Sequence, residues 1–319
     1  MIKPSTNLPF PEIWDNSMRA SFVACPSQFY LSYIENFDSA VISIHLHFGK
    51  CFARGCEVFR KTYYDPDGSR DFDWALIKGT EAILAEWGDY EPEFDPGAKT
   101  LDRCISALEV YFTEHNPATD YIQPYIKQDG TPAVEFSFSI PIPEVLHPTT
   151  GLPIIYCGRF DMLGTYQDRL AVIDEKTSTA LGQTWRNQFD LRSQFTGYCW
   201  AAQKEDYSVI GAFVRGIGLL KTKTIFEEVI TMRPQWKIDQ WYEQLVYDLR
   251  RARDCWINGR WDQDFAEACA SYGGCKFKPI CDSRSPLSWA PSHFLRRSWD
   301  PISGENKLIA PKEGYEDFE

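Results

Sequence analysis

The sequence lacks any stretch that could cross a membrane. A spanning helix needs about 20 consecutive, mostly apolar residues. An uncharged stretch such as Val145–Gly158 is shorter than this and is interrupted by His147, Pro148 and Pro153. The first residues, with Lys3 and two early prolines, also lack the apolar segment of a secretory signal peptide. We therefore expect a protein of the cytoplasm that does not contact membranes.

Positive charge is scarce relative to negative charge. The 319 residues include 33 Lys and Arg against 45 Asp and Glu, for a formal net charge of −12. This excludes nucleic-acid binding by bulk charge, as histones bind DNA, so any DNA contact needs a local basic surface. One segment, 269–297, is basic, with Asp282 as its one acidic residue; its cations are Lys276, Lys278, Arg284, Arg296 and Arg297. Unevenly distributed, solvated charge explains this segment equally well.

The composition is otherwise that of a folded globular protein. Hydrophobic residues make up 44%, charged residues 24% and aromatic residues 15% of the chain, which excludes disorder of the bulk. No internal repeat, low-complexity tract or change of composition marks a second domain. We therefore predict a single domain over residues 1–284, followed by an irregular tail at 285–319.

The hydrophobic pattern predicts a mixed α/β fold. Helical spacing predicts a helix over Trp14–Asn36, broken near Cys25-Pro26, and a helical region at about 50–120 formed by Gly49–Tyr63, Trp74–Trp87 and Thr100–Glu114. Alternating polarity predicts a sheet core at about 132–233, with strands at Ala133–Ile142, Ile154–Tyr166, Arg169–Ser178, Tyr207–Lys221 and Thr224–Arg233. A helix at Asp190–Lys204 interrupts these strands, and a long helix at Gln235–Asn258 follows them.

Four of the ten cysteines are candidate metal ligands. In a reducing compartment we expect no structural disulfides. The default for most thiols is a small buried side chain, which we expect for Cys51, Cys56, Cys104, Cys157, Cys199 and Cys255. In contrast, Cys269, Cys275 and Cys281 lie within thirteen residues, in a loop that glycine and proline keep irregular. Cys25, at a helix start before Pro26, is the best candidate for a fourth ligand.

The spacing of these cysteines favours an iron–sulfur cluster over a single ion. Structural zinc sites usually pair cysteines two to four residues apart, whereas five residues separate Cys269 from Cys275 and Cys275 from Cys281. A cluster accepts wider spacing because it is larger than one ion. Zinc, or no metal at all, stays open on spacing alone.

A second candidate site lies on two neighbouring strands. Alternation places Asp174 and Lys176 on one face of their strand and Glu175 on the other. A hairpin centred between residues 167 and 168 would pair Asp161 with Asp174 on the same face, at about 4.5–5.5 Å between Cβ atoms. Like charges at this distance destabilise the pair unless a cation compensates, and hard oxygen ligands suit Mg²⁺ or Mn²⁺. The alternative is an exposed hairpin with solvated charges.

These residues resemble motifs of the PD-(D/E)XK nuclease superfamily. Asp161, in Gly-Arg-Phe-Asp, is similar to the first acidic motif, and Asp174–Lys176 is similar to (D/E)-x-K. Gln194 and Tyr198 resemble the Q-x-x-x-Y motif of the RecB-like branch, and their i,i+4 spacing puts both on one helix face. The resemblance implies a restriction-endonuclease-like fold, in which a central mixed β-sheet is flanked by helices, with a helical N-terminal region and a cysteine-cluster C-terminal loop.

The resemblance also implies an activity, site residues and a partner. It implies a metal-dependent deoxyribonuclease, an exonuclease or endonuclease that acts on DNA in recombination, repair or defence. Mg²⁺ or Mn²⁺ would bind the carboxylates of Asp161 and Asp174 and the backbone carbonyl of Glu175. Lys176 would orient the attacking water, while Gln194 and Tyr198 would position the strand or support the metal-binding face.

The cysteines extend the resemblance to a subset of this branch that includes AddB and the CRISPR adaptation nucleases. These enzymes bind a [4Fe–4S] cluster through one N-terminal and three C-terminal cysteines. Cys25 resembles the first ligand, and Cys269, Cys275 and Cys281 resemble the others, although the gap after Cys269 is wider than usual. The implied cluster would be structural and would hold the C-terminal loop to the N-terminal helix.

One position departs from the family pattern. The branch usually has a histidine ligand in a helix shortly after a Phe-Gly pair, but here Phe48-Gly49 is followed by Ala53 at that position. Glu57, one turn later, or a water could substitute. His45 and His47 are expected to precede the helix and not to bind metal.

Two other classes of function remain possible at this point. The first is a non-catalytic nucleic-acid-binding or adaptor protein that keeps the nuclease fold, which the missing histidine would explain. The second is a structural or regulatory module built on the cysteine cluster, for which the carboxylate–lysine face would have no purpose.

Overall fold

The computed structural model describes residues 8–39, 42–265, 267–270, 274–283 and 290–309. It divides into two compact units, the first formed by residues 1–40, 138–158 and 240–319 and the second by residues 41–137 and 159–239. The sequence gives little hint of this division, because three of its four chain boundaries, at 137/138, 158/159 and 239/240, fall inside strands and a helix and not in linkers.

The second unit begins with three packed helices, α3 (Ile44–Tyr63), α4 (Phe72–Trp87) and α5 (Leu101–Glu114). Each helix starts after a side-chain cap: Ser43, Asp71 and Thr100 accept hydrogen bonds from the backbone N–H groups of His45, Trp74 and Arg103. Their apolar faces form a common core, in which Phe59 stacks on Phe112 at 3.5 Å between ring centroids.

A glycine allows α3 and α4 to pack closely. A Cβ atom at Gly79 would lie 2.9 Å from the backbone oxygen of Gly55, closer than real Cβ contacts. A larger residue at Gly79 would therefore push the two helices apart.

The sheet is formed by strands of mixed direction. They are β3 (Gln123–Pro124), β4 (Val134–Leu146), β5 (Pro153–Tyr166), β6 (Arg169–Ser178), β7 (Val209–Leu219) and β8 (Thr224–Met232). The hydrogen-bonded order is β5-β6-β7-β8, with β3 and β4 also pairing with β5. The β5–β6 and β7–β8 pairs are antiparallel and β6–β7 is parallel.

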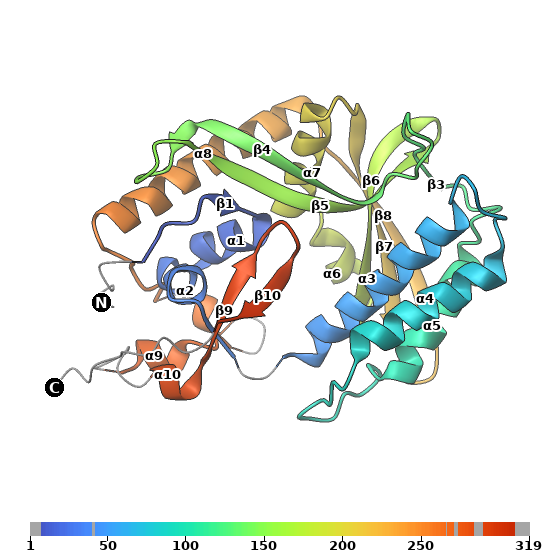
Figure 1. Cartoon of the computed structure of the whole chain (residues 1–319), viewed down its shortest axis with the longest axis horizontal. Coiled ribbons are helices and arrows are strands. Elements are labelled where there is room, and N and C mark those ends of the chain that lie inside the picture. The colour runs from blue at the N-terminus through green and yellow to red at the C-terminus, as the bar shows by residue number, and fades with distance from the viewer. Residues whose placement is uncertain (1–7, 40–41, 266, 271–273, 284–289, 310–319) are drawn as a thin grey trace. The chain divides into compact units, whose positions relative to one another are not determined.

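Helices flank these strands. The parallel strands β6 and β7 are joined through α6 (Gln183–Asn187) and α7 (Ser193–Lys204). Within the second unit, α3, α4 and α5 lie on one side of the strands and α7 on the other (Figure 1). The predicted fold class, a central mixed sheet flanked by helices, is confirmed.

The first unit is built from the two ends of the chain. It contains β1 (Ile13–Trp14), α1 (Asn16–Ala24), α2 (Pro26–Phe29), a π-helical turn (Tyr30–Ile34), β2 (Phe37–Asp38), most of α8 (Gln235–Ile257), a 3-10 turn (Glu267–Cys269), α9 (Lys278–Cys281), α10 (Ala290–His293), β9 (Leu295–Asp300) and β10 (Glu305–Leu308). Its core is aromatic, with Trp14 stacked on Phe29 at 4.5 Å and Trp261 against Phe29 and Tyr30.

The prediction of an irregular tail from Ser285 is wrong for part of this segment. Strands β9 and β10 form an antiparallel hairpin, and β9 pairs with β2 near the N-terminus. The Trp299 ring N–H donates to Asp15 at 2.8 Å, which anchors the hairpin. Strand pairing to a distant partner overrides the local proline signals on which the prediction rested. Residues 284–289 and 310–319 of the predicted tail lie outside the described residues.

The other predicted elements agree with the structure to within a few residues, and β6 has the predicted bounds. The main difference is that α3 begins at Ile44 and not at Gly49, because Ser43 caps it. His45 and His47 therefore lie in its first turn, which corrects their placement before the helix. No helix in the described part of the chain is long and apolar enough to span a membrane.

Candidate functional site

The β5–β6 hairpin has the register that the sequence predicts. Its two-residue loop, Gln167-Asp168, has φ angles of 48° and 60°, as a type I′ turn requires. The paired residues run from Tyr166↔Arg169 to Met162↔Ile173. The recorded pairs end there, and the same register continued by one step would place Asp161 opposite Asp174.

Burial and the charge of the neighbouring carboxylate make ionisation of Asp161 and Asp174 unfavourable. The Asp174 side chain is fully buried. Burial raises the pKa of Asp161 well above its usual range, and the Asp174 carboxylate raises it further. Burial likewise raises the pKa of Asp174. Both carboxylates therefore favour a nearby positive charge.

Lys176 supplies one such charge. Its Nζ lies 2.7 Å from Oδ1 and 2.6 Å from Oδ2 of Asp174, on the same face of β6. Burial opposes the charged form of Lys176, but Asp174 and Asp161 raise its pKa on balance. The lysine remains protonated beside the carboxylate pair.

This face fits a divalent cation that retains part of its water shell. Oδ2 of Asp174 is buried and, apart from its ion-pair contact with Lys176 at 2.6 Å, has no hydrogen bond, so a cation that shares this oxygen with the lysine could use it as a ligand. Within the described ranges, no three or more His, Cys, Asp or Glu side chains are grouped so that they could hold a metal ion. Two side-chain carboxylates therefore remain, which suits Mg²⁺, an ion that usually keeps several waters.

Glu175 points to the opposite face of β6, as alternation predicts. Its carboxylate is held by the Arg60 guanidinium from α3 and by the Tyr111 hydroxyl from α5, which donates to Oε1 at 2.8 Å. Arg60 also donates to the Tyr111 hydroxyl at 3.2 Å. Burial opposes ionisation of Glu175, but Arg60 lowers its pKa on balance. The side chain of Glu175 is thus occupied, and its backbone carbonyl is left as the possible ligand.

Gln194 and Tyr198 lie next to each other on α7. The Gln194 side-chain amide donates to the Tyr198 hydroxyl at 3.2 Å. The Tyr198 ring is 5.3 Å from that of Phe160, which precedes Asp161 in β5. The helix face that carries this pair therefore meets the strand that carries Asp161.

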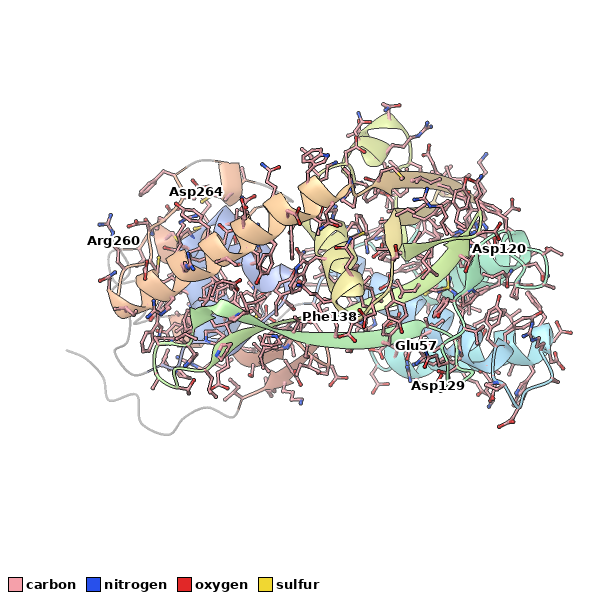
Figure 2. All side chains as sticks on the ribbon, turned by 90° about the horizontal axis from the view of Figure 1, so that it is seen from above. Glu57, Asp120, Asp129, Phe138, Arg260 and Asp264 are labelled. Carbon is pink, nitrogen blue, oxygen red and sulfur yellow. The ribbon has the colours of Figure 1, made fainter. Side chains whose placement is uncertain are left out.

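Glu57, one of the substitutes considered for the missing histidine, is paired with two cations of its own helix. Its two oxygens lie 2.6 Å from Arg54 Nη1 and 2.6 Å from Lys61 Nζ. Figure 2 labels Glu57 on α3. Ala53, the residue at the histidine position, has no metal-binding atom in its side chain.

The sequence reasoning missed Glu135. This β4 residue has a positive φ of 47°, and its side chain is 7% exposed and lies 2.9 Å from Nε of Arg159. Burial raises its pKa to about 7, and its charge in turn raises the pKa of Asp161. The sequence signal that could have identified Glu135 was a carboxylate placed between two apolar strand residues, Val134 and Phe136.

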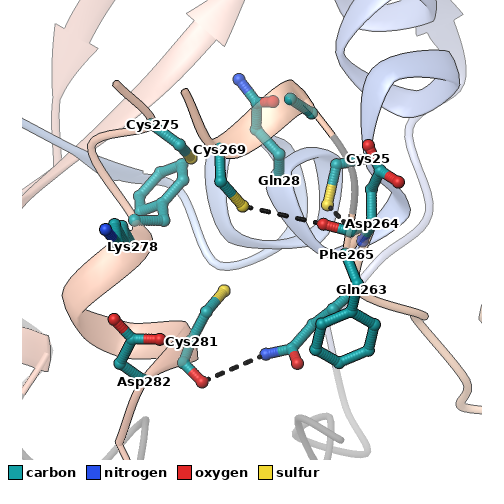
Figure 3. Close-up of a pocket in the computed structure, with 12 residues that line it drawn as sticks. Cys25, Gln28, Gln263, Asp264, Phe265, Cys269, Cys275, Lys278, Cys281 and Asp282 are labelled. Atoms are coloured by element: carbon teal, nitrogen blue, oxygen red, sulfur yellow. Dashed lines mark hydrogen bonds between the residues drawn. The ribbon is translucent and has the colours of Figure 1, made fainter. Parts of the chain in front are cut away.

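The four candidate cysteines line a single cavity. Cys25, Cys269, Cys275 and Cys281 surround a space of about 220 Å³ in the first unit, and their sulfur atoms face this space in Figure 3. Backbone groups of Asp264 contact two of them: its N–H lies 3.4 Å from the Cys25 sulfur and its carbonyl oxygen 3.7 Å from the Cys269 sulfur. The cavity is larger than one ion, but among the described residues the four sulfurs are not grouped closely enough to hold a metal.

The remaining cysteines and the basic segment have structural surroundings. Cys51, Cys56, Cys104, Cys157 and Cys199 are buried, and Cys255 is half-buried. In the basic segment, Lys276 and Arg297 pair with Asp38, and Arg296 pairs with Glu35. Arg284 lies outside the described residues. Three of the cations on which a basic DNA-binding surface depended are therefore ion-paired, two of them with the same carboxylate.

Comparison with known proteins gives one family. The family model described as the PD-(D/E)XK nuclease superfamily matches residues 17–282. No curated protein matches the chain. Among solved structures, the one titled "Crystal structure of SSO0001" is 13% identical, covers 61% of this chain and 74% of its own, and superposes with a TM-score of 0.25.

Proposed function

The chain belongs to the PD-(D/E)XK nuclease superfamily, and from this premise we propose that it is a divalent-metal-dependent deoxyribonuclease that acts at DNA ends. The observation that carries the proposal is the buried face of Asp161, Asp174 and Lys176. Two carboxylates with raised pKa values beside a protonated lysine are typical of a functional site, since a purely structural role would favour compensated charges.

The carboxylates of Asp161 and Asp174 and the backbone carbonyl of Glu175 would hold Mg²⁺ or Mn²⁺. When bound, the ion lowers the pKa of water and offsets charge on the scissile phosphate. Within the chain, Lys176 orients the attacking water and stabilises the negative charge that develops on the phosphoryl oxygens. Its contact with Asp174 keeps the ammonium on the reacting face.

Gln194 and Tyr198 would position the nucleic-acid strand. Their hydrogen bond fixes both side chains on one face of α7. The contact of Tyr198 with Phe160 holds this face beside Asp161. A strand seated here would present its phosphate to the carboxylates without the need for a large basic surface.

The four-cysteine cavity would hold a [4Fe–4S] cluster with a structural role. Its lining of four thiols, with a volume of about 220 Å³, supports a group larger than one ion. Iron and acid-labile sulfide should be present after purification without oxygen and should be lost in Cys25→Ser. Cys255→Ser is the matched control, because this half-buried cysteine does not line the cavity. Full iron content in Cys25→Ser would refute the ligand set.

Cleavage of end-labelled linear DNA, with nicked and closed circular DNA as comparisons, tests the nuclease proposal. With Mg²⁺ or Mn²⁺ the wild-type protein should degrade linear DNA, and Lys176→Ala and Asp174→Ala should not. Lys221→Ala, at an exposed position after β7, is the matched control and should cleave normally. If the wild-type protein binds DNA but cuts none of these substrates in either metal, the adaptor function is correct. The alanine at position 53, where the family usually has a histidine ligand, is the feature that favours this alternative.

A further inference from the structure

One buried cation in the second unit has no counterion. Lys99, in the loop between α4 and α5, is 4% exposed, yet its ammonium makes no hydrogen bond or ion pair with any residue that the structure describes. The Phe48 ring lies 5.7 Å from Nζ, measured to the ring centroid. By contrast, the buried Arg60 and Arg215 each pair with a carboxylate. Burial lowers the pKa of Lys99, and no neighbouring carboxylate offsets this effect.

The first turn of α3 adds to the positive potential around Lys99. Burial is the main cause of the lowered pKa of His45, and the charge of Lys99 lowers this pKa further. The lysine therefore lies near this turn. The 20-residue helix carries about half a unit of positive charge at its N-terminus, and its first turn contains no acidic residue. The Tyr90 hydroxyl donates to the Ile42 carbonyl at 2.8 Å, which holds the α4–α5 loop at this end of α3. Figure 1 shows the loop and the start of α3 at the same end of the helices.

The start of α3 also lies beside the end of β6. A Cβ atom at Gly49 would be 3.8 Å from the Thr177 hydroxyl, and Thr177 directly follows Lys176. Gly49 in turn follows Phe48, the ring nearest to the Lys99 ammonium. The unpaired cation is therefore connected, through two residues of α3, to the strand that carries the proposed reacting lysine.

We propose that Lys99 and the first turn of α3 form a second phosphate-binding site, which holds a backbone phosphate of the DNA strand next to the one cleaved. The proposal rests on the proposed function, because it takes the same strand as its ligand. An ammonium beside a helix N-terminus binds a phosphate as a point charge and does not read bases. The site thus supplies the local positive charge that a chain of net charge −12 needs in order to bind DNA.

The proposal makes stability and binding change in opposite directions. Burial of most of the Lys99 side chain lowers the pKa of its ammonium, so the charge destabilises the folded protein, and a bound phosphate would offset this effect. Lys99→Met keeps the length of the side chain and removes the charge. It should therefore raise the melting temperature and weaken DNA binding, whereas a lysine with a merely structural role would lower the melting temperature when replaced.

Binding of a fluorescent oligonucleotide in EDTA, over a range of KCl concentrations, tests the site. Lys99→Met should bind roughly tenfold more weakly at low salt. The slope of log affinity against log salt should become shallower by about 0.7 for single strands or about 0.9 for duplex. Lys99→Arg should keep the slope. Lys78→Met is the matched control, because Lys78 is on α4, pairs with Glu81 at 2.7 Å and should leave the slope unchanged.

Several outcomes would overturn the site. The first is an unchanged salt slope in Lys99→Met, and the second is a lowered melting temperature of this variant. The third is a loss of binding in Lys99→Met that occurs with 5′-phosphorylated oligonucleotides but not with 5′-hydroxyl ones, which would indicate that the site binds a terminal phosphate instead. Cleavage in Mn²⁺ is scored separately. A wild-type protein that binds DNA but does not cut it refutes the nuclease proposal, and the Lys99 site is still supported if the salt slope changes in Lys99→Met. A wild-type protein that binds no DNA refutes both proposals.

Discussion

At the scale of single residues, three consecutive positions of β6 have three different electrostatic situations. Burial raises the pKa of Asp174, Arg60 lowers that of Glu175, and the neighbouring aspartates raise that of Lys176. The alternation of strand side chains separates these environments, because Asp174 and Lys176 share one face and Glu175 faces α3 and α5. Glu175, held by Arg60, has a structural role, whereas Asp161 and Asp174 share the charge of one lysine and are where a metal would bind.

The raised carboxylate pKa values predict a pH-dependent effect of metal on stability. The folded, metal-free protein holds protons on Asp161 and Asp174 more tightly than the unfolded chain, so its stability should fall as the pH rises above the ordinary carboxyl range. Mn²⁺ at ten times the dissociation constant measured at pH 8 should add about 1.4 kcal/mol there, and the same Mn²⁺ concentration should add less at pH 5. Thermal unfolding in Mn²⁺ and in EDTA measures it. An equal gain in Asp174→Asn would contradict the assignment.

Ala53 predicts weak metal binding that one substitution should improve. Ala53→His places an imidazole at the position where the RecB-like branch usually has its histidine ligand. The metal concentration for half-maximal cleavage should fall by roughly tenfold, since metal sites commonly change by 10–100-fold with such interactions. Ala53→Leu, which adds bulk without a ligand atom, is the control. A histidine variant that responds to metal like wild type would show that α3 does not reach the metal.

At the scale of elements, the network of Arg60, Tyr111 and Glu175 holds β6 against α3 and α5. Arg60→Met should cost about 3–5 kcal/mol of unfolding free energy, because it leaves the Glu175 carboxylate buried without its partner. Arg60→Met with Glu175→Met should cost less than the sum of the two single changes. Urea unfolding of the four proteins gives the coupling energy, and additive costs would show that the pair does not interact.

The β5–β6 turn predicts a register effect on activity. One glycine inserted between Gln167 and Asp168 should move Asp174 to the other face and reduce cleavage at least 100-fold. Replacing the loop by Asn-Gly should instead keep activity and add about 1 kcal/mol of stability, since both loop residues have positive φ. Cleavage assays and urea unfolding of both variants check this. Retained activity in the insertion variant would mean that a bulge absorbs the extra residue.

At the scale of the whole molecule, the two units carry separate candidate sites. The cysteine cavity lies in the first unit and the carboxylate–lysine face in the second. Each site is assembled within its own unit, so changes in one can be read separately from changes in the other.

This separation predicts different effects of two substitutions. Cys275→Ala should lower the melting temperature of the iron-loaded protein by several degrees, because a bound cluster contributes to folding stability. Lys176→Ala should abolish cleavage without any loss of iron. Calorimetry and iron content of both variants measure this. A Cys275→Ala protein with normal iron and an unchanged melting temperature would rule out the structural cluster.

The sequence by itself predicted most elements and both groups of candidate residues. Period-2 alternation and a two-residue turn are local properties, so the register of the β5–β6 hairpin from Tyr166↔Arg169 to Met162↔Ile173 could be read from the chain. The same holds for the opposite direction of Glu175 and for the i,i+4 pair Gln194 and Tyr198. The family resemblance added roles that no local pattern contains.

Only the tertiary structure decided what lies far apart in sequence. The partners of Glu175 come from α3 and α5, more than 60 residues away, and the pairing of β9 with β2 turned a predicted irregular tail into a hairpin. The raised pKa of Glu135 and the missing counterion of Lys99 depend on burial, which packing creates. Local propensity acts over a few residues, whereas burial and charge compensation depend on every element that packs around a side chain.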